Sequence, residues 1–132
     1  MSAQLKSLGD WVDELFSDIF FQPDDAFALK AYEERVDPSL IVRINHDRFT
    51  FDQYKEAVKN GRTTSEFSPQ STSQILKWDD SEKKGGAVAQ LFKFTVKSKE
   101  TGQETPATSV ILSVVRWIGG KRVLTEMTEV NV

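Results

Sequence analysis

The spacing of apolar residues changes near residue 70, and this change limits the possible folds more than any other feature of the chain. Before it, apolar residues recur every three or four positions, which is the period of an amphipathic helix. After it, side chains alternate, with Gln74, Leu76 and Trp78 in one set and Ile75 and Lys77 in the other, which is the period of a strand. We therefore expect one α+β domain over residues 1–132, with N-terminal helices packed on a C-terminal antiparallel sheet.

Two helices are expected to open the chain. Seven apolar residues at helical spacing place the first at about 5–20: Leu5, Leu8, Val12, Leu15, Phe16, Ile19 and Phe20. Pro23-Asp24-Asp25 offers a helix-start proline and two carboxylates for the positive end of the helix dipole. The second helix is therefore expected to run from there to about Arg35, and Asp37-Pro38 is expected to end it.

A third helix is predicted by its capping residues. Thr50 and Gln53 have the spacing of a capping box, in which each side chain bonds the backbone of the other. The helix is expected to cover about Phe51 to Lys59 and to stop at Asn60-Gly61, because glycine readily adopts the left-handed conformation that ends helices. The polar segment Gly61–Pro69 that follows is interpreted as a mobile loop at the rim of the domain.

Five strands are expected. Leu40–Ile44 is short, β-branched and bounded by turn residues, so it is interpreted as the first. Glycine-containing separators, including Gly85-Gly86, Gly102 and Gly119-Gly120, predict hairpins between four longer strands. These strands are expected at Ser71–Asp79, Ala87–Ser98, Thr105–Ile118 and Lys121–Val130.

Composition argues against several classes of function. The formal net charge is −3 and basic residues are scattered, so neither a nucleic-acid partner nor a membrane partner is expected. The chain has no cysteine and one histidine, His46, which argues against disulfides and a histidine-based metal site. No glycine loop suited to phosphate precedes a helix, so no cofactor is expected. Residues 1–6 lack a continuous apolar stretch, which favours a cytoplasmic protein.

The order of these elements resembles the nuclear transport factor 2-like superfamily. The segment Asp37–Asn45 is similar to that superfamily's passage from helix to first strand, and Val115–Val123 is similar to its closing hairpin. The chain length is similar to that of its SnoaL-like polyketide cyclases and ketosteroid isomerases. The resemblance implies a cone-shaped barrel, formed by a curved, mainly antiparallel sheet on three helices, that binds a small apolar molecule in its mouth.

The Gly119-Gly120 turn predicts the register of the last two strands. A two-residue turn places Ile118 opposite Lys121, and regular alternation then assigns every later residue to one of two faces. Both faces are largely apolar, and three helices can cover only one of them. We therefore expect a homodimer through the other face, which in this register carries Val110, Leu112, Val114, Val123 and Met127.

The resemblance also implies which face is concave. In the ketosteroid-isomerase-like pattern, the strand before the closing hairpin sends a carboxylic acid into the pocket at the slot filled here by Ser113. Regular pairing then places Glu126 opposite Ser113, among apolar side chains that would raise the pKa of its carboxyl group as an acid or base requires. Candidate ligand-binding residues on this face and the preceding strand are Gln90, Phe92, Phe94, Ser113, Val115, Trp117, Leu124 and Thr128.

Each catalytic candidate has a structural alternative. Glu126 would be either an acid or base, or a carboxylate held by Ser113 or an arginine. His46 would be either a second proton carrier or a turn residue, because Asn45-His46-Asp47-Arg48 is turn-like. The tyrosine and aspartate that the isomerase-like pattern places on the first helix and first strand have no match here. Ketosteroid isomerisation by that set of residues is therefore not expected.

Three functions remain open on this reasoning, and whether the protein is an enzyme stays open with them. One is binding of a small hydrophobic molecule in the cone, with acid–base isomerase, cyclase or dehydratase chemistry as an option. The second is a non-catalytic dimeric protein-interaction module whose core is filled by its own side chains. The third is a transport-factor-like adaptor for other proteins, which would need an exposed apolar patch beyond the dimer face. An open cavity favours the first function, and a closed core favours the second.

Overall fold

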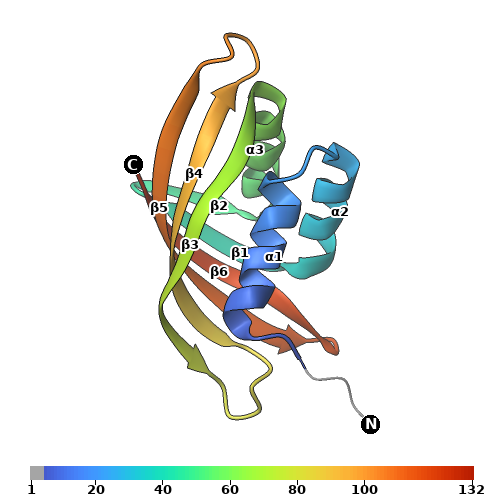
Figure 1. Ribbon diagram of the computed structural model, residues 1–132. Helices are drawn as coiled ribbons and strands as arrows, with labels where there is room; N and C mark the ends of the chain where they lie inside the picture. Colours follow the sequence, from blue (N-terminus) through green and yellow to red (C-terminus); the bar gives the residue numbers. More distant parts are fainter. Residues whose placement is uncertain (1–4) are drawn as a thin grey trace.

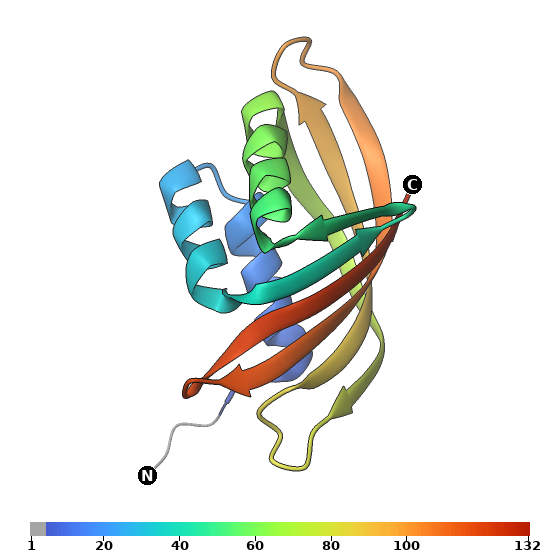
Figure 2. The same cartoon turned by 180° about the vertical axis from the view of Figure 1, so that it is seen from behind.

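In the described part of the chain, three helices cover the concave face of a curved six-stranded sheet, and the convex face carries no helix (Figures 1 and 2). The computed structural model describes residues 5–132, so most of the N-terminal segment considered above lies outside it. The helices are α1 (Leu8–Phe20), α2 (Asp25–Arg35) and α3 (Phe51–Thr64). The strands are β1 (Val36–Ile44), β2 (Asp47–Thr50), β3 (Ser65–Asp79), β4 (Gly86–Ser98), β5 (Glu104–Ile118) and β6 (Lys121–Asn131).

The sheet has the order β2-β1-β6-β5-β4-β3, and only the β1–β6 pair is parallel. The predicted α+β class is confirmed. The sheet is curved but open, however, because β2 and β3 form free edges and do not pair with each other. The cone is therefore half of a barrel, and the helices close its other side.

Capping residues set the beginnings of the helices. Ser7 and Asp24 accept backbone N–H groups at the starts of α1 and α2, so α1 begins at Leu8 and Pro23 precedes the second helix. The predicted capping box between Thr50 and Gln53 is present at the start of α3.

The prediction that Asn60-Gly61 ends the third helix is wrong. The helix continues to Thr64, and the threonine hydroxyls of its last turn donate to carbonyls one turn earlier. Gly61 keeps a helical conformation, and the following residues enter β3 directly at Ser65. The segment interpreted as a rim loop is therefore the end of a helix followed by the first part of a long edge strand.

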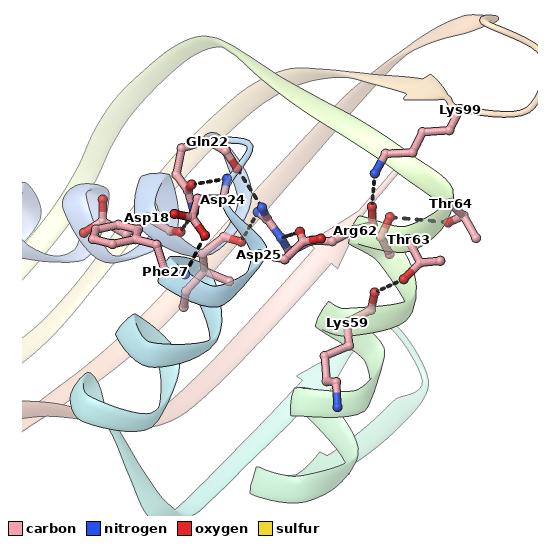
Figure 3. A network of polar contacts seen from close by, with 12 residues as sticks. Asp18, Gln22, Asp24, Asp25, Phe27, Lys59, Arg62, Thr63, Thr64 and Lys99 are labelled. Carbon is pink, nitrogen blue, oxygen red and sulfur yellow. Dashed lines mark hydrogen bonds and ion pairs between the residues drawn. The ribbon is translucent and has the colours of Figure 1, made fainter.

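Arg62 explains why this helix extends. Its guanidinium group is buried and donates to Asp25 Oδ1 at 2.7 Å, to the carbonyl of Ile19 at 2.8 Å and to that of Gln22 at 2.7 Å (Figure 3). Lys99, from the β4–β5 connection, donates in turn to the Arg62 carbonyl. One side chain therefore joins the end of α3 to the connection between α1 and α2.

The first strand is longer than predicted and forms a hairpin. It begins at Val36, so Pro38 lies inside the strand, where the pairing of β1 with β6 is irregular. After a turn at Asn45 and His46, β2 pairs antiparallel with β1. Asn45 has a φ of 53°, and asparagine tolerates this left-handed conformation better than most residues. The β2 strand was not predicted.

The core lies between the helices and the concave face of the sheet. It includes Leu15 and Ile19 from α1, Tyr32 from α2, and Val88 and Leu124 from the sheet. Within residues 5–132, none of the helices is both long enough and apolar enough to cross a membrane.

Candidate functional site

A cavity of about 290 Å³ opens between α3, the end of α1 and the concave face of the sheet. Its walls are mainly aromatic, and the phenylalanines that line it are Phe16, Phe20, Phe21, Phe67, Phe92 and Phe94. They contact one another edge-on or tilted, with centroid distances such as 5.6 Å for Phe16 and Phe92. This volume is near the lower end for small-molecule sites in proteins.

Local periodicity places these rings. On β4, alternation sends Phe92, Phe94 and Val96 to the concave side, and the end of α1 adds rings spaced four residues apart. Phe92 and Phe94, two of the predicted ligand-binding residues, line this cavity under the helices. Phe16, Phe20 and Phe67 were not predicted as lining residues, because helix spacing marks the first two as core and the third lay in the presumed loop.

One end of the cavity is polar. Glu129 of β6 is 9% exposed, and its Oε2 atom accepts from the Ser109 hydroxyl at 2.9 Å and from Asn131 Nδ2 at 2.9 Å. Among the described residues, nothing donates to its other oxygen, Oε1, and protein atoms do not enclose it. Because Glu129 lines the cavity, this free oxygen is available to a ligand.

The carboxylate is held by a chain of hydrogen bonds that reaches the β1–β2 turn. Asn131 Nδ2 also donates to Ser109 at 2.8 Å, and the Asn131 backbone exchanges two hydrogen bonds with the Asn45 side chain. The Asn45 N–H donates to the Glu129 carbonyl at 2.9 Å. Glu129 is therefore oriented by Ser109 of β5, by Asn131 of its own strand and by Asn45 of the β1–β2 turn.

Tyr54 of α3 lines the same cavity. Burial raises the pKa of its phenol well above the usual value, and the negative charge of Glu129 raises this pKa further. The phenol is consequently protonated at neutral pH and remains a hydrogen-bond donor. The cavity thus offers a fixed acceptor and a donor in an otherwise apolar space.

A β-bulge explains why Glu129, and not Glu126, faces the cavity. Ile118 pairs with Lys121 and Val115 with Leu124, as the glycine turn predicts. Glu126 then pairs with Val114, so Thr125 is an extra residue, buried with its hydroxyl donating to the Val114 carbonyl at 3.3 Å. One extra residue exchanges the two faces for the rest of β6.

The predicted placements beyond this bulge are wrong. Glu126 and Thr128 are exposed on the convex side, and Met127 lies in the core opposite Ser113 instead of in a dimer face. Val123, also assigned to that face, is buried. His46 is exposed in the β1–β2 turn, in agreement with its structural alternative.

The remaining predicted ligand residues divide between the core and a different groove. Gln90, Ser113, Val115 and Leu124 are fully buried but do not line the cavity. Gln90 Nε2 donates to Asp13 of α1 at 2.8 Å, and the pKa of Asp13 is raised because burial penalises its charge. Trp117 pairs with Arg122 as expected, yet both lie in a separate groove near the start of α1.

The sequence contains a signal that could have identified Glu129. Glu126 and Glu129 are three residues apart, so an uninterrupted strand must send them to opposite faces. One carboxylate therefore faces inward in either register, and only the bulge decides which one. Among residues 5–132, no group of three or more His, Cys, Asp or Glu side chains is arranged to hold a metal ion.

Comparison with known proteins supports the fold without giving a function. No protein-family model matches the chain, and no curated protein matches it either. Among solved structures, a conserved protein from Planctomyces limnophilus DSM 3776 superimposes with a TM-score of 0.77 at 9% identity, covering 92% of this chain and 93% of that one. A ketosteroid isomerase-like protein from Erwinia carotovora atroseptica SCRI1043 superimposes with a TM-score of 0.75 at 13% identity, and the match covers 96% of this chain and 94% of that one.

A third structure carries the name of the fold. An NTF2-like (nuclear transport factor 2-like) protein of unknown function in nutrient uptake, from Rhodospirillum rubrum ATCC 11170, gives a TM-score of 0.72 at 15% identity, covering 93% of this chain and 97% of that one. The chain therefore has the nuclear transport factor 2-like fold, as its element order predicts. At these identities the likeness establishes the fold alone.

Proposed function

We propose that the protein binds a small, mainly apolar molecule in the cavity and that the Glu129 carboxylate exchanges a proton with it. The observation that carries this proposal is the convergence of six phenylalanines on one free, oriented carboxylate oxygen. A cavity of about 290 Å³ favours this function over a module whose core is filled by its own side chains.

The polar end of the cavity suits a carbonyl compound with an acidic hydrogen on the neighbouring carbon. Glu129 Oε1 would take this proton, and the C–H electron pair would move toward the carbonyl oxygen as an enolate. The Tyr54 phenol would donate a hydrogen bond to that oxygen, because it stays protonated. Return of the proton to another carbon would complete an isomerisation. In a dehydration, the enolate would instead expel a β-hydroxyl group, which would take the proton from Glu129 and leave as water.

Ligand binding can be tested by filling the cavity. Ala57 lies on α3, is exposed and lines the cavity, so Ala57→Phe should narrow the opening without disturbing the core. We expect apolar cyclic ketones to raise the melting temperature of the natural protein by several degrees, corresponding to about 2.7 kcal/mol at a hundredfold excess over Kd. Ala57→Phe should remove this increase.

Asn60→Phe is the matched control for this experiment. Asn60 is exposed on the same helix and does not line the cavity. Ketones should therefore still raise the melting temperature of the Asn60→Phe protein. An equal increase in the Ala57→Phe protein would place the ligand elsewhere and overturn the proposal.

We further propose that the convex face of the sheet pairs with a second copy of the chain. Leu76 is 73% exposed and Trp78 64% exposed on β3, and Val110 and Leu112 of β5 and Val130 of β6 continue the apolar surface across the sheet. Neighbouring exposed apolar side chains on one sheet face are typical of a protein–protein contact. This face keeps Val110, Leu112 and Val114 from the predicted set but excludes Met127.

A charge on this face should prevent dimerisation. We expect the natural protein to sediment as a dimer at about 50 μM, and Leu112→Lys to sediment as a monomer, because pairing would bury an uncompensated ammonium group. Phe27→Lys is the control, since Phe27 of α2 has a similar exposure, 45% against 44%, away from the sheet. A monomeric natural protein would contradict the proposal.

A further inference from the structure

The β5–β6 turn lies near the start of α1 at one end of the sheet (Figure 2). A second groove is lined by residues of these two segments. It has a volume of about 380 Å³ and shares no lining residue with the cavity described above. Four cationic side chains and one carboxylate line it: Lys6, Arg35, Lys121, Arg122 and Glu14. A basic lining is unexpected in a chain whose formal net charge is −3.

Two of these cations have no carboxylate partner among the described residues. Lys6 pairs with Glu14, and Arg35 pairs with Asp18 at 2.7 Å. Lys121, in contrast, donates to the carbonyl of Glu34 at 2.6 Å and makes no ion pair in this part of the chain. The positive charge of the groove is therefore only partly neutralised.

Arg122 is the more informative of the two. It is 7% exposed and donates to the carbonyls of Lys84, Lys6 and Lys83 at 2.6, 2.7 and 3.2 Å. Arg62 has the same exposure but also an ion pair with Asp25 at 2.7 Å. A buried cation held only by neutral carbonyls leaves a positive potential, and it retains two N–H groups beyond the three already used.

Aromatic side chains form the rest of the groove. Trp11 of α1 and Trp117 of β5 line it, and Trp117 is 38% exposed. Lys84 Nζ lies over the Trp117 ring, 5.0 Å from its centroid, and also pairs with Glu82 Oε2 at 3.2 Å. Indole rings next to cations can stack with a planar ring while the cations bind its acidic substituent.

We propose that this groove binds a small aromatic anion, with its ring against Trp117 and its anionic group near Lys121 and Arg122. The anionic group is a carboxylate or a phosphate, because the oxygens of both accept charge-assisted hydrogen bonds from lysine and arginine. The proposal is independent of Glu129 and of the apolar cavity.

The indole N–H resonances of the three tryptophans provide the test. Titration with phenyl phosphate and with benzoate should shift the Trp11 and Trp117 signals with saturation, at a Kd of about 1 mM. The Trp78 signal should not move, because Trp78 is exposed on β3, outside the groove. Whichever of the two ligands binds more tightly identifies the preferred anionic group.

Neutral and ring-free probes and two lysine variants complete the experiment. Benzyl alcohol and inorganic phosphate should each bind about tenfold more weakly, and Lys121→Gln and Lys84→Gln should each weaken phenyl phosphate binding about fivefold. Glu129→Gln should leave the affinity unchanged, which separates this site from the cavity. Absence of saturation below about 20 mM, equal binding of benzyl alcohol, or unchanged affinity in both lysine variants would overturn the proposal.

Discussion

Glu129→Gln is expected to lower the rate of proton exchange in a bound ketone by about a thousandfold, because an amide cannot accept the proton that the carboxylate would take. Glutamine has the same size, and its amide oxygen can still accept from Ser109 and Asn131, as Glu129 Oε2 does at 2.9 Å from each. The measurement is deuterium uptake at the carbon beside the carbonyl, followed by NMR in D₂O with the ketone that gives the largest thermal stabilisation.

The same strand supplies a matched control. Glu126→Gln removes the same charge three residues away, but Glu126 is exposed on the convex side of the sheet. Its exchange rate should therefore equal that of the natural protein. If the two variants exchange at the same rate, the proton acceptor is neither Glu129 nor any group that Glu129 controls, and the acid–base part of the proposed function fails.

These two glutamates also show what the sequence can and cannot predict. Period-two alternation and the Gly119-Gly120 turn correctly predict the strands and the first four pairs of the closing hairpin. A bulge has no comparable local signature at Thr125, because the residue is held by burial and by a hydrogen bond to Val114 across the sheet. The register of β5 and β6 before the bulge was therefore predictable from the sequence. The face of the sheet on which Glu129 lies was not.

The end of α3 shows the same limit for a helix. Asn60-Gly61 is a strong local stop signal, yet the helix passes through it, because Arg62 makes three hydrogen bonds to groups 37 to 43 residues earlier in the chain. Local propensity is worth about 1 kcal/mol at a glycine, and three charged hydrogen bonds outweigh it. Sequence patterns thus identify most elements. Contacts between distant segments decide where α3 ends and where the two faces of β6 exchange.

Arg62→Met is accordingly expected to destabilise the protein strongly. Methionine retains most of the apolar volume of the side chain but leaves the buried Ile19 carbonyl and the partly buried Gln22 carbonyl without their donor. Asp25 contributes less to the expected loss, because its side chain is 72% exposed and water can solvate it. We expect the free energy of unfolding to fall by about 3 kcal/mol and the melting temperature by about 10 °C.

Chemical denaturation and calorimetry measure this loss, and Arg43→Met is its control. Arg43 of β1 is exposed and makes no ion pair among residues 5–132, so its replacement should change the unfolding free energy by less than about 0.5 kcal/mol. In Arg62→Met, the loss should be accompanied by faster amide exchange at the end of α3 and in the α1–α2 connection, because these two segments are the ones that the guanidinium joins. A loss near that of the control, with exchange unchanged in both segments, would mean that α3 is held past Gly61 by the packing of β3 alone.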